Sequence, residues 1–235
     1  MIIHIQKRLG ETPNSLISRF KQENPEYSKE KISFAGRLDP MASGEMILLI
    51  GESCKLQPTF IAKKKTYSFT IINGIITDSN DILGIPKLLS LEKDKNVMRD
   101  FSLEPKEFIQ QFPVYSSRVV SGHPLWWWAK KERLQEIEIP SKECEIYSVK
   151  QNSRKLIASS LLLNDIKIKI GTLDAKTSEG FRTQEIISCW QKLLDKHRMY
   201  VIDNYTVSVS SGTYIRGICD AMGGTAMDIH RISID

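Results

Sequence analysis

A short apolar run, residues 46–50 (MILLI), constrains the fold of this chain more than any other segment. It is too short for a helix of ordinary length and is followed at once by Gly51, which indicates a buried strand. Just before the run, Asp39 precedes Pro40, and a proline ring holds the preceding residue in an extended or turn conformation. The sequence therefore predicts a carboxylate on a stiff turn at the edge of a hydrophobic core.

Composition is that of an ordinary soluble globular protein. Of the 235 residues, 41% are hydrophobic and 26% are charged. No apolar stretch approaches the roughly 20 residues that cross a bilayer, and the N-terminus lacks a signal-peptide pattern. The four cysteines have no C-x-x-C spacing, so neither a disulfide framework nor a zinc site is expected. We therefore expect an intracellular, cytoplasmic protein with no membrane partner, and the nucleus or an organelle stays open.

The net charge of +5 is compatible with a nucleic-acid partner without being diagnostic of one. The four histidines show no metal-ligand spacing, and neither phosphate-binding nor dinucleotide-binding glycine loops occur. No serine or cysteine lies in a nucleophile-elbow context. The sequence thus predicts no bound metal and no cofactor.

Strand and helix patterns are mixed along the chain without regular βαβ alternation. The predicted strands lie in 1–6, 46–50, 67–71, 164–171 and 203–212, with a further short strand before a turn at 122–124. The predicted helices begin after Thr12, near Leu125 and after Thr213, and also cover 107–112 and 186–194. Residues 84–106 look like a charged surface connection. This order predicts an α+β fold, a mainly antiparallel mixed sheet flanked by helices.

Two residues stand out on physical grounds before any motif is considered. Arg216 lies in the first turn of a predicted helix, where the macrodipole disfavours a cation, so a carboxylate or phosphate partner would compensate. A solvent-facing arginine fits the pattern equally well. Tyr67 lies on the apolar face of its predicted strand, which buries the ring. For Tyr67, as for Asp39, a structural role is the commoner one.

The triplet 126–128 (WWW) adjoins Lys130, Lys131 and Arg133. Aromatic rings on a basic surface are typical of RNA base stacking, and ordinary helix packing is the alternative. Three successive helical residues point in different directions, so at most one or two of the rings can be buried.

Four segments, in order along the chain, resemble the motifs of the TruB family of tRNA pseudouridine synthases. The family's G-x-L-D-P-x-A-[ST]-G, aliphatic run and G-E-[AS]-x-K correspond to GRLDPMASGEMILLIGESCK. Its K-x-Y, G-x-x-T-D and D-x-x-G correspond to KKTYSFTIINGIITDSNDILG. The third and fourth motifs correspond to FPVYSSRVVSGHPLWWWAKK and SSGTYIRGICDAMG, and QKRLGETPNSL is similar to the family's N-terminal entry loop.

The resemblance implies roles for individual residues. Asp39 would be the essential aspartate, Tyr67 the tyrosine stacked on the target base, and Arg216 the arginine that pairs with the aspartate. The residues assigned to substrate binding, by these motifs or by a place beside them, are Lys7, Gly10, Phe34, Arg37, Lys63, Lys64, Lys65, Tyr214 and Ile229.

The chain also departs from the family pattern. Phe34 stands where bacterial members usually carry a histidine that helps displace tRNA loop bases. Residues 171–199 look like an insertion beside the last sheet strands. The chain ends at Asp235, so we expect one catalytic domain over 1–235 without the C-terminal RNA-binding (PUA-type) extension common in the family.

The implied reaction isomerises a flipped-out uridine to pseudouridine by breaking the N1–C1′ bond and rejoining the base through C5. The expected substrate is the T-loop uridine (uridine-55) of tRNA, bound through the T arm by a monomer. Two alternatives stay open: a catalytically silent RNA-binding or tRNA-folding module, and a synthase for another RNA stem–loop. Whether Asp39 attacks the sugar or base, or removes a sugar proton, also stays open.

Overall fold

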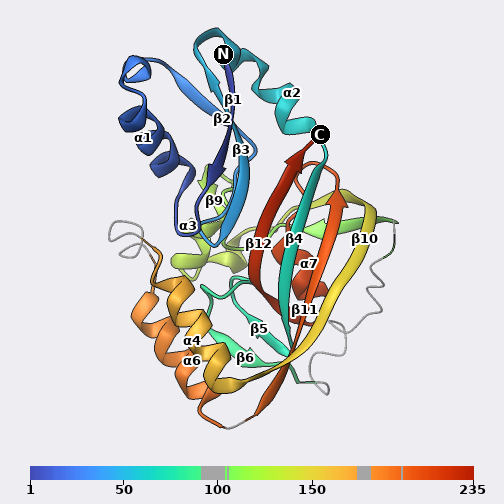
Figure 1. Cartoon of the computed structure of the whole chain (residues 1–235). Helices are drawn as coiled ribbons and strands as arrows, with labels where there is room; N and C mark the ends of the chain where they lie inside the picture. The colour runs from blue at the N-terminus through green and yellow to red at the C-terminus, as the bar shows by residue number, and fades with distance from the viewer. Residues whose placement is uncertain (91–103, 105, 174–180, 197) are drawn as a thin grey trace.

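The structure is a computed structural model that describes residues 1–90, 104, 106–173, 181–196 and 198–235. An eight-stranded sheet forms its centre (Figure 1). The strand order is β1-β3-β12-β4-β11-β10-β7, with β2 paired to β3. The strands are β1 (Ile2–Lys7), β2 (Ile32–Ala35), β3 (Ala42–Ile50), β4 (Lys65–Asn73), β7 (Lys106–Gln111), β10 (Ser141–Ala158), β11 (Met199–Val209) and β12 (Gly224–Ile234).

Helices flank the sheet (Figure 1). They are α1 (Pro13–Glu23), α2 (Gln57–Ala62), α3 (Leu125–Lys130), α4 (Ser159–Ile170), α6 (Thr183–Leu194) and α7 (Ile215–Ala221), with 3-10 turns at Pro25–Tyr27, Gly51–Leu56 and Leu134–Glu136. Two small hairpins pair β5 (Ile75–Thr77) with β6 (Pro86–Leu88) and β8 (Val119–Val120) with β9 (His123–Pro124). In Figure 1, α7 lies behind β4 and β11, and α4 and α6 stand side by side next to β5 and β6.

Alternation along β4 divides the interior between two cores. Tyr67, Phe69 and Ile71 are buried in a core that also contains Ile218 and Cys219 of α7. Ile72 faces the other way, into a core built from α4 and α6 that contains Trp190. Successive strand residues point to opposite faces, so one sequence segment supports both cores.

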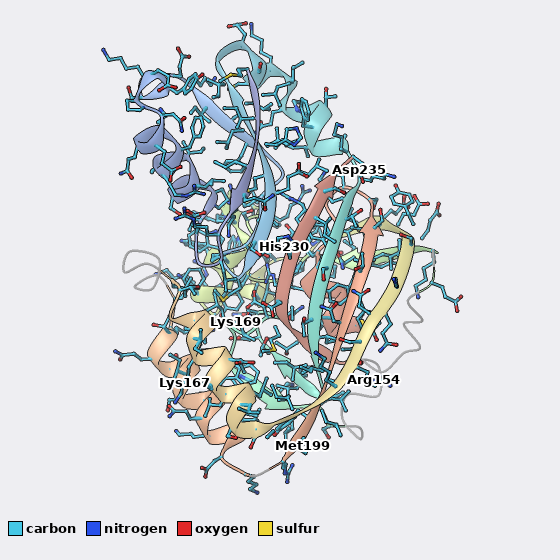
Figure 2. The ribbon with its side chains drawn as sticks, in the orientation of Figure 1. Arg154, Lys167, Lys169, Met199, His230 and Asp235 are labelled. Carbon is cyan, nitrogen blue, oxygen red and sulfur yellow. The ribbon has the colours of Figure 1, made fainter. Side chains whose placement is uncertain are left out.

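The sheet is antiparallel except where β12 pairs with β3, among the strands that the structure describes. In that parallel pair Ile229 lies opposite Ala42, and Arg231 lies opposite Gly44. The chain therefore brings its last strand beside the segment that follows Asp39. Lys169 lies on α4, on the side toward β12 (Figure 2). It donates to the carboxylate of Asp228 on β12 at 2.5 Å, which ties the helical layer to the same strand.

The predicted α+β class is confirmed, as are most of the predicted elements. The run 46–50 forms the buried end of β3, and 67–71 and 203–209 lie in β4 and β11. Thr12 caps α1 as predicted, since its hydroxyl accepts from the backbone N–H of Ser15 and the Ser15 hydroxyl accepts in return.

Two predicted elements are wrong. Residues 107–112, predicted as a helix, lie mainly in β7, because exposed and inward side chains alternate along 106–111 and the strand pairs with β10. The segment 164–171, predicted as a strand, lies in α4 up to Ile170, and Gly171 caps the helix. Leu162, Ile166 and Ile170 are buried at a spacing of four, while Ile168 is 61% exposed. Isoleucine occurs at every second position of this segment, as in a strand, and the segment is too short to show the helical period.

The predicted surface connection 84–106 is described only in part. Residues 86–88 form β6, and 91–103 lie outside the described residues. In the part of the chain that the structure covers, no helix is long and apolar enough to cross a membrane.

Replacing Gly44 with alanine should destabilise the fold by about 2 kcal/mol or more. Gly44 has φ +109°, and a β-carbon there would lie 2.2 Å from the carbonyl oxygen of Arg231, so β3 and β12 would have to separate. Ser43→Ala, one residue away and partly exposed, should change stability by less than about 0.5 kcal/mol. Urea unfolding of both variants measures the difference, and equal midpoints would contradict this account of the β3–β12 contact.

Candidate active site

The loop between β2 and β3 holds Asp39 at the edge of a cavity. The carbonyl of Asp39 accepts from the N–H of Ala42 at 3.0 Å, which closes the turn. Lys7 donates to the carbonyls of Ala42 at 2.5 Å and Pro40 at 3.5 Å, and the N–H of Gly10 donates to that of Pro40 at 2.9 Å. Lys7 and Gly10 thus fix the backbone on which the carboxylate stands.

Gly10 is held by close contact as well as by conformation. Its φ is +83°, in the left-handed region, and a β-carbon there would lie 2.2 Å from the carbonyl oxygen of Thr172. Only glycine fits this position. The entry loop therefore packs against the end of α4 and supports the Asp39 turn from the side away from the cavity.

Arg216 pairs with Asp39, a residue 177 positions away in the chain. Its Nε donates to Oδ2 of Asp39 at 2.8 Å, and its Nη1 donates to the carbonyl of Ser79 at 2.6 Å. Nη2 makes a longer contact of 3.4 Å to the carbonyl of Tyr115. All three guanidinium nitrogens have partners and the side chain is buried, so the cation has one orientation. The predicted position of Arg216 in the first turn of a helix is confirmed, and a carboxylate compensates its charge.

A second carboxylate, Asp81, lies beneath the same guanidinium at 3.5 Å. Its Oδ1 accepts from the Ser79 hydroxyl at 2.8 Å and from the backbone N–H of Leu83 at 2.9 Å. Burial raises the pKa of Asp81, and Arg216 opposes that shift. Burial disfavours the charge of Arg216, but Asp39 and Asp81 more than offset this, so the pKa of Arg216 is raised.

Sequence reasoning missed Asp81 as part of the site. It lies inside the quoted segment TDSNDILG, where the D-x-x-G spacing marks it. The neighbouring Thr77 and Ser79 and the turn residue Gly84 are typical of a loop whose own hydroxyl and backbone N–H groups bind a carboxylate. This pattern in the sequence could have identified Asp81.

The cavity in front of Asp39 has a volume of about 420 Å³, within the range of small-molecule sites. Its walls combine aromatic and aliphatic side chains with several cations. Among the predicted site residues, those that line it are Phe34, Arg37, Asp39, Lys65, Tyr67, Tyr214, Arg216 and Ile229. Lys7 and Gly10 lie behind the Asp39 turn, and Lys63 and Lys64 precede β4 without lining the cavity. Arg231 lines the cavity and was not predicted.

Tyr67 and Ile229 reach the cavity from neighbouring strands. Tyr67 is on β4 and Ile229 is on β12, and the two strands are paired antiparallel. Tyr67 is only 7% exposed, which matches the burial predicted for it. An aromatic face and an aliphatic side chain from adjacent strands can enclose a flat heterocycle.

Tyr214 is fixed at the start of α7 by Gln110 of β7. The Gln110 side chain accepts from the N–H of Tyr214 at 2.8 Å and donates to its carbonyl at 3.0 Å. A β-carbon at Gly217 would lie 2.7 Å from the Gln110 amide nitrogen, so glycine makes room for this pair. Burial raises the pKa of Tyr214, and the Asp39 charge adds to the shift. Tyr214 therefore stays neutral beside the carboxylate.

The tryptophan triplet shows the predicted division between packing and exposure. Trp128 is buried and its indole N–H donates to the carbonyl of Val120 at 3.0 Å. Trp126 is 41% exposed, with the Lys130 ammonium 5.5 Å from its ring centre. Within the described part of the chain, no group of three or more His, Cys, Asp or Glu side chains is arranged to hold a metal ion.

Comparison with known proteins agrees with this architecture. The chain shares its fold with a solved chain from the crystal structure of a Cbf5-Nop10-Gar1 complex, at a TM-score of 0.52 and 15% identity, covering 99% of this chain and 48% of that one. It is 34% identical over 150 residues to tRNA pseudouridine synthase B of Caldicellulosiruptor saccharolyticus, covering 63% of this chain and 50% of the relative. It is 33% identical over 221 residues to tRNA pseudouridine synthase B of Xanthomonas campestris pv. campestris, covering 88% of this chain and 69% of the relative.

The sheet flanked by helices is that of a pseudouridine synthase-like α+β fold. A family model described as TruB family pseudouridylate synthase (N terminal domain) matches residues 24–173. The chain belongs to this family. It spans 50% to 69% of the length of the two curated relatives named above.

The protonation of Lys7 should make folding stability depend on pH in an unusual window. Burial lowers the pKa of Lys7 from 10.5 to about 8, against the opposing effect of Glu11 and Asp39. Between those values the unfolded chain binds the proton more tightly, so stability rises as pH rises from about 8 to 10.5.

Lys7→Met removes this contribution. The stability of the wild type relative to the variant should increase across that window by an amount of the order of 3 kcal/mol, the free energy equivalent of the altered pKa. Urea unfolding at a series of pH values measures it. Stability curves that stay parallel for the two proteins would show that Lys7 remains charged in the fold.

Proposed function

We propose that this protein is an RNA pseudouridine synthase in which Asp39 acts directly on the target nucleotide. The observation that carries the proposal is the ion pair between Asp39, which is partly exposed to the cavity, and the buried Arg216. A binding module has no need of a carboxylate held in this way, because a carboxylate repels the phosphates of RNA. The pair therefore favours catalysis over the binding-only alternative.

The cavity walls suit an extruded uracil. A base inside a helix cannot be reached by an enzyme side chain, so the nucleotide must leave its stack at a cost of a few kcal/mol. Tyr67 offers an aromatic face for stacking and Ile229 an aliphatic one, which together repay part of that cost. The Asp39 carboxylate then lies at the side of the enclosed nucleotide.

The proposed isomerisation balances without any added group. The N1–C1′ bond breaks, the uracil turns, and a C5–C1′ bond forms. C5 loses its proton to the solvent or a side chain, and N1 gains one. An ionised oxygen beside the nucleotide serves attack on the sugar, attack on the base, or removal of a sugar proton, and all three routes stay open. Arg216 orients that oxygen before the substrate arrives.

The favoured substrate is the T-loop uridine of a tRNA. The relatives named above are tRNA pseudouridine synthases, and cations at the cavity suit the phosphates of an RNA arm. Phe34, in the position of the family's usual histidine, lines the cavity with the Arg37 guanidinium 5.7 Å from its ring centre. This aromatic and cationic pair favours a second candidate, another RNA stem–loop. A single-domain organisation, an insertion at 171–199, a monomeric state and a cytoplasmic location stay predictions.

Release of tritium from RNA labelled at uridine C5 tests the proposal, because the C5 proton must leave when the new bond forms. Wild-type protein should release it from a tRNA transcript, whereas Asp39→Asn should lower the rate by at least about a thousandfold and keep RNA affinity within about threefold. Asp195→Asn, an exposed change of the same kind, serves as the matched control. Substantial turnover by Asp39→Asn would remove Asp39 from its role, and absence of release from tRNA and from total cellular RNA would favour the binding-only module.

A further inference from the structure

A group of cations lies at the end of the cavity formed by β4 and β12, and the chemistry of Asp39 does not use it. Lys65 and Arg231 both line the cavity and both are buried, at 4% and 1% exposure. They meet at Gly36: a β-carbon at that glycine would lie 3.4 Å from Nη1 of Arg231 and 3.6 Å from Cε of Lys65. Lys142 lies at the adjoining loop, where its ammonium donates to the carbonyl of Ser211.

No carboxylate balances this group in the part of the chain that the structure describes: Lys65, Lys142 and Arg231 form no ion pair there. Burial, together with the charges of Arg231, Lys142 and Lys63, lowers the pKa of Lys65 from 10.5 to about 8. Buried cations are normally paired, so an outside anion is the missing partner.

Hydrogen-bond donors remain available at this place. Arg231 uses Nε for the carbonyl of Glu45 at 2.7 Å and Nη2 for that of Gly36 at 3.1 Å, and Nη1 has no acceptor among the described residues. Lys65 donates to the carbonyls of Ile61 and Lys63, which leaves one of its three N–H groups. The backbone acceptors fix both side chains, and both residues line the cavity.

The strand register relates this group to the proposed base pocket. Lys65 precedes Tyr67 by two residues on the same face of β4, a distance of about 7 Å along the strand. Arg231 lies directly opposite Tyr67 on β12. In a nucleotide whose base stacks on Tyr67, one ribose separates the base from the flanking phosphates. Lys65 and Arg231 lie at about this separation from Tyr67.

We propose that Lys65 and Arg231, supported by Lys142, form an anion subsite that holds one of the two phosphodiesters flanking the flipped nucleotide. The inference rests on the proposed function, since it names a part of the substrate. The subsite contacts phosphate and carries no sequence information. Its physical task is to anchor the backbone so that the extruded nucleotide cannot rotate away from Asp39.

Neutralising single phosphates of the RNA tests the subsite in the intact protein. The probe is a T-arm RNA stem–loop carrying one methylphosphonate, an uncharged replacement for a phosphodiester, on the 5′ or the 3′ side of the target uridine or in the stem. Binding is measured by fluorescence anisotropy at one salt concentration. For the wild type, one of the two flanking replacements should weaken binding by about tenfold or more, and the stem replacement should weaken it far less.

Protein variants assign that loss to the subsite. Arg231→Gln, and independently Lys65→Gln, should bind the unmodified RNA about tenfold more weakly than the wild type. In each variant, the flanking methylphosphonate that weakens binding to the wild type should lower the affinity by less than about twofold. Lys29→Gln, which removes an exposed charge that does not line the cavity, should behave like the wild type. Thermal unfolding reports whether each variant is folded.

Two outcomes overturn the subsite. One is equal sensitivity of the wild type at flanking and stem linkages, a result that needs no variant. The other is a flanking loss that persists in full in both folded variants. A wild type that binds and isomerises the unmodified RNA but shows either outcome removes only this inference. A wild type that neither binds nor isomerises RNA removes the proposed function together with it.

Discussion

The buried guanidinium of Arg216 is the group on which the site depends. It joins the Asp39 turn, the Ser79–Asp81 loop and the Tyr115 segment, which come from three separate parts of the chain. Burying a cation is unfavourable unless carboxylates and carbonyls surround it, and breaking such a group from one side leaves an uncompensated charge. The surroundings of the guanidinium are therefore complete only with all three segments in place, and the carboxylate that faces the cavity is oriented as a consequence.

The sheet supplies the frame for this arrangement. β12 lies between β3 and β4, so the strand after the Asp39 turn and the strand that carries Tyr67 share one neighbour. Close backbone contact at Gly44 and the reach of Lys7 to the carbonyls after Asp39 hold that frame rigid. Tyr67, Lys65, Ile229 and Arg231 line the cavity from the paired strands β4 and β12, which gives this part of its wall a precise geometry.

Much of the fold was predictable, and the exceptions have physical causes. Strict alternation identified β4, and the misplaced charge of Arg216 pointed to an outside partner. The prediction of α4 as a strand was wrong because the apolar period of a short window fits both a helix and a strand. The prediction of β7 as a helix was wrong because pairing with β10 determines its conformation. The roles of Asp39, Tyr67 and Arg216 came from resemblance to the family motifs. Asp81 was missed although the D-x-x-G spacing marks it. Arg231 was missed because burial of a charge and its lack of an ionic partner are properties of three-dimensional structure.

The most direct test of the central claim is the single-turnover rate of pseudouridine formation by Arg216→Lys, measured together with its affinity for the same RNA. Lysine keeps the positive charge but cannot bind Asp39 and the Ser79 carbonyl in the fixed geometry of a guanidinium. The account predicts a rate at least about a hundredfold below that of the wild type, with affinity within about threefold. A rate near that of the wild type would contradict it.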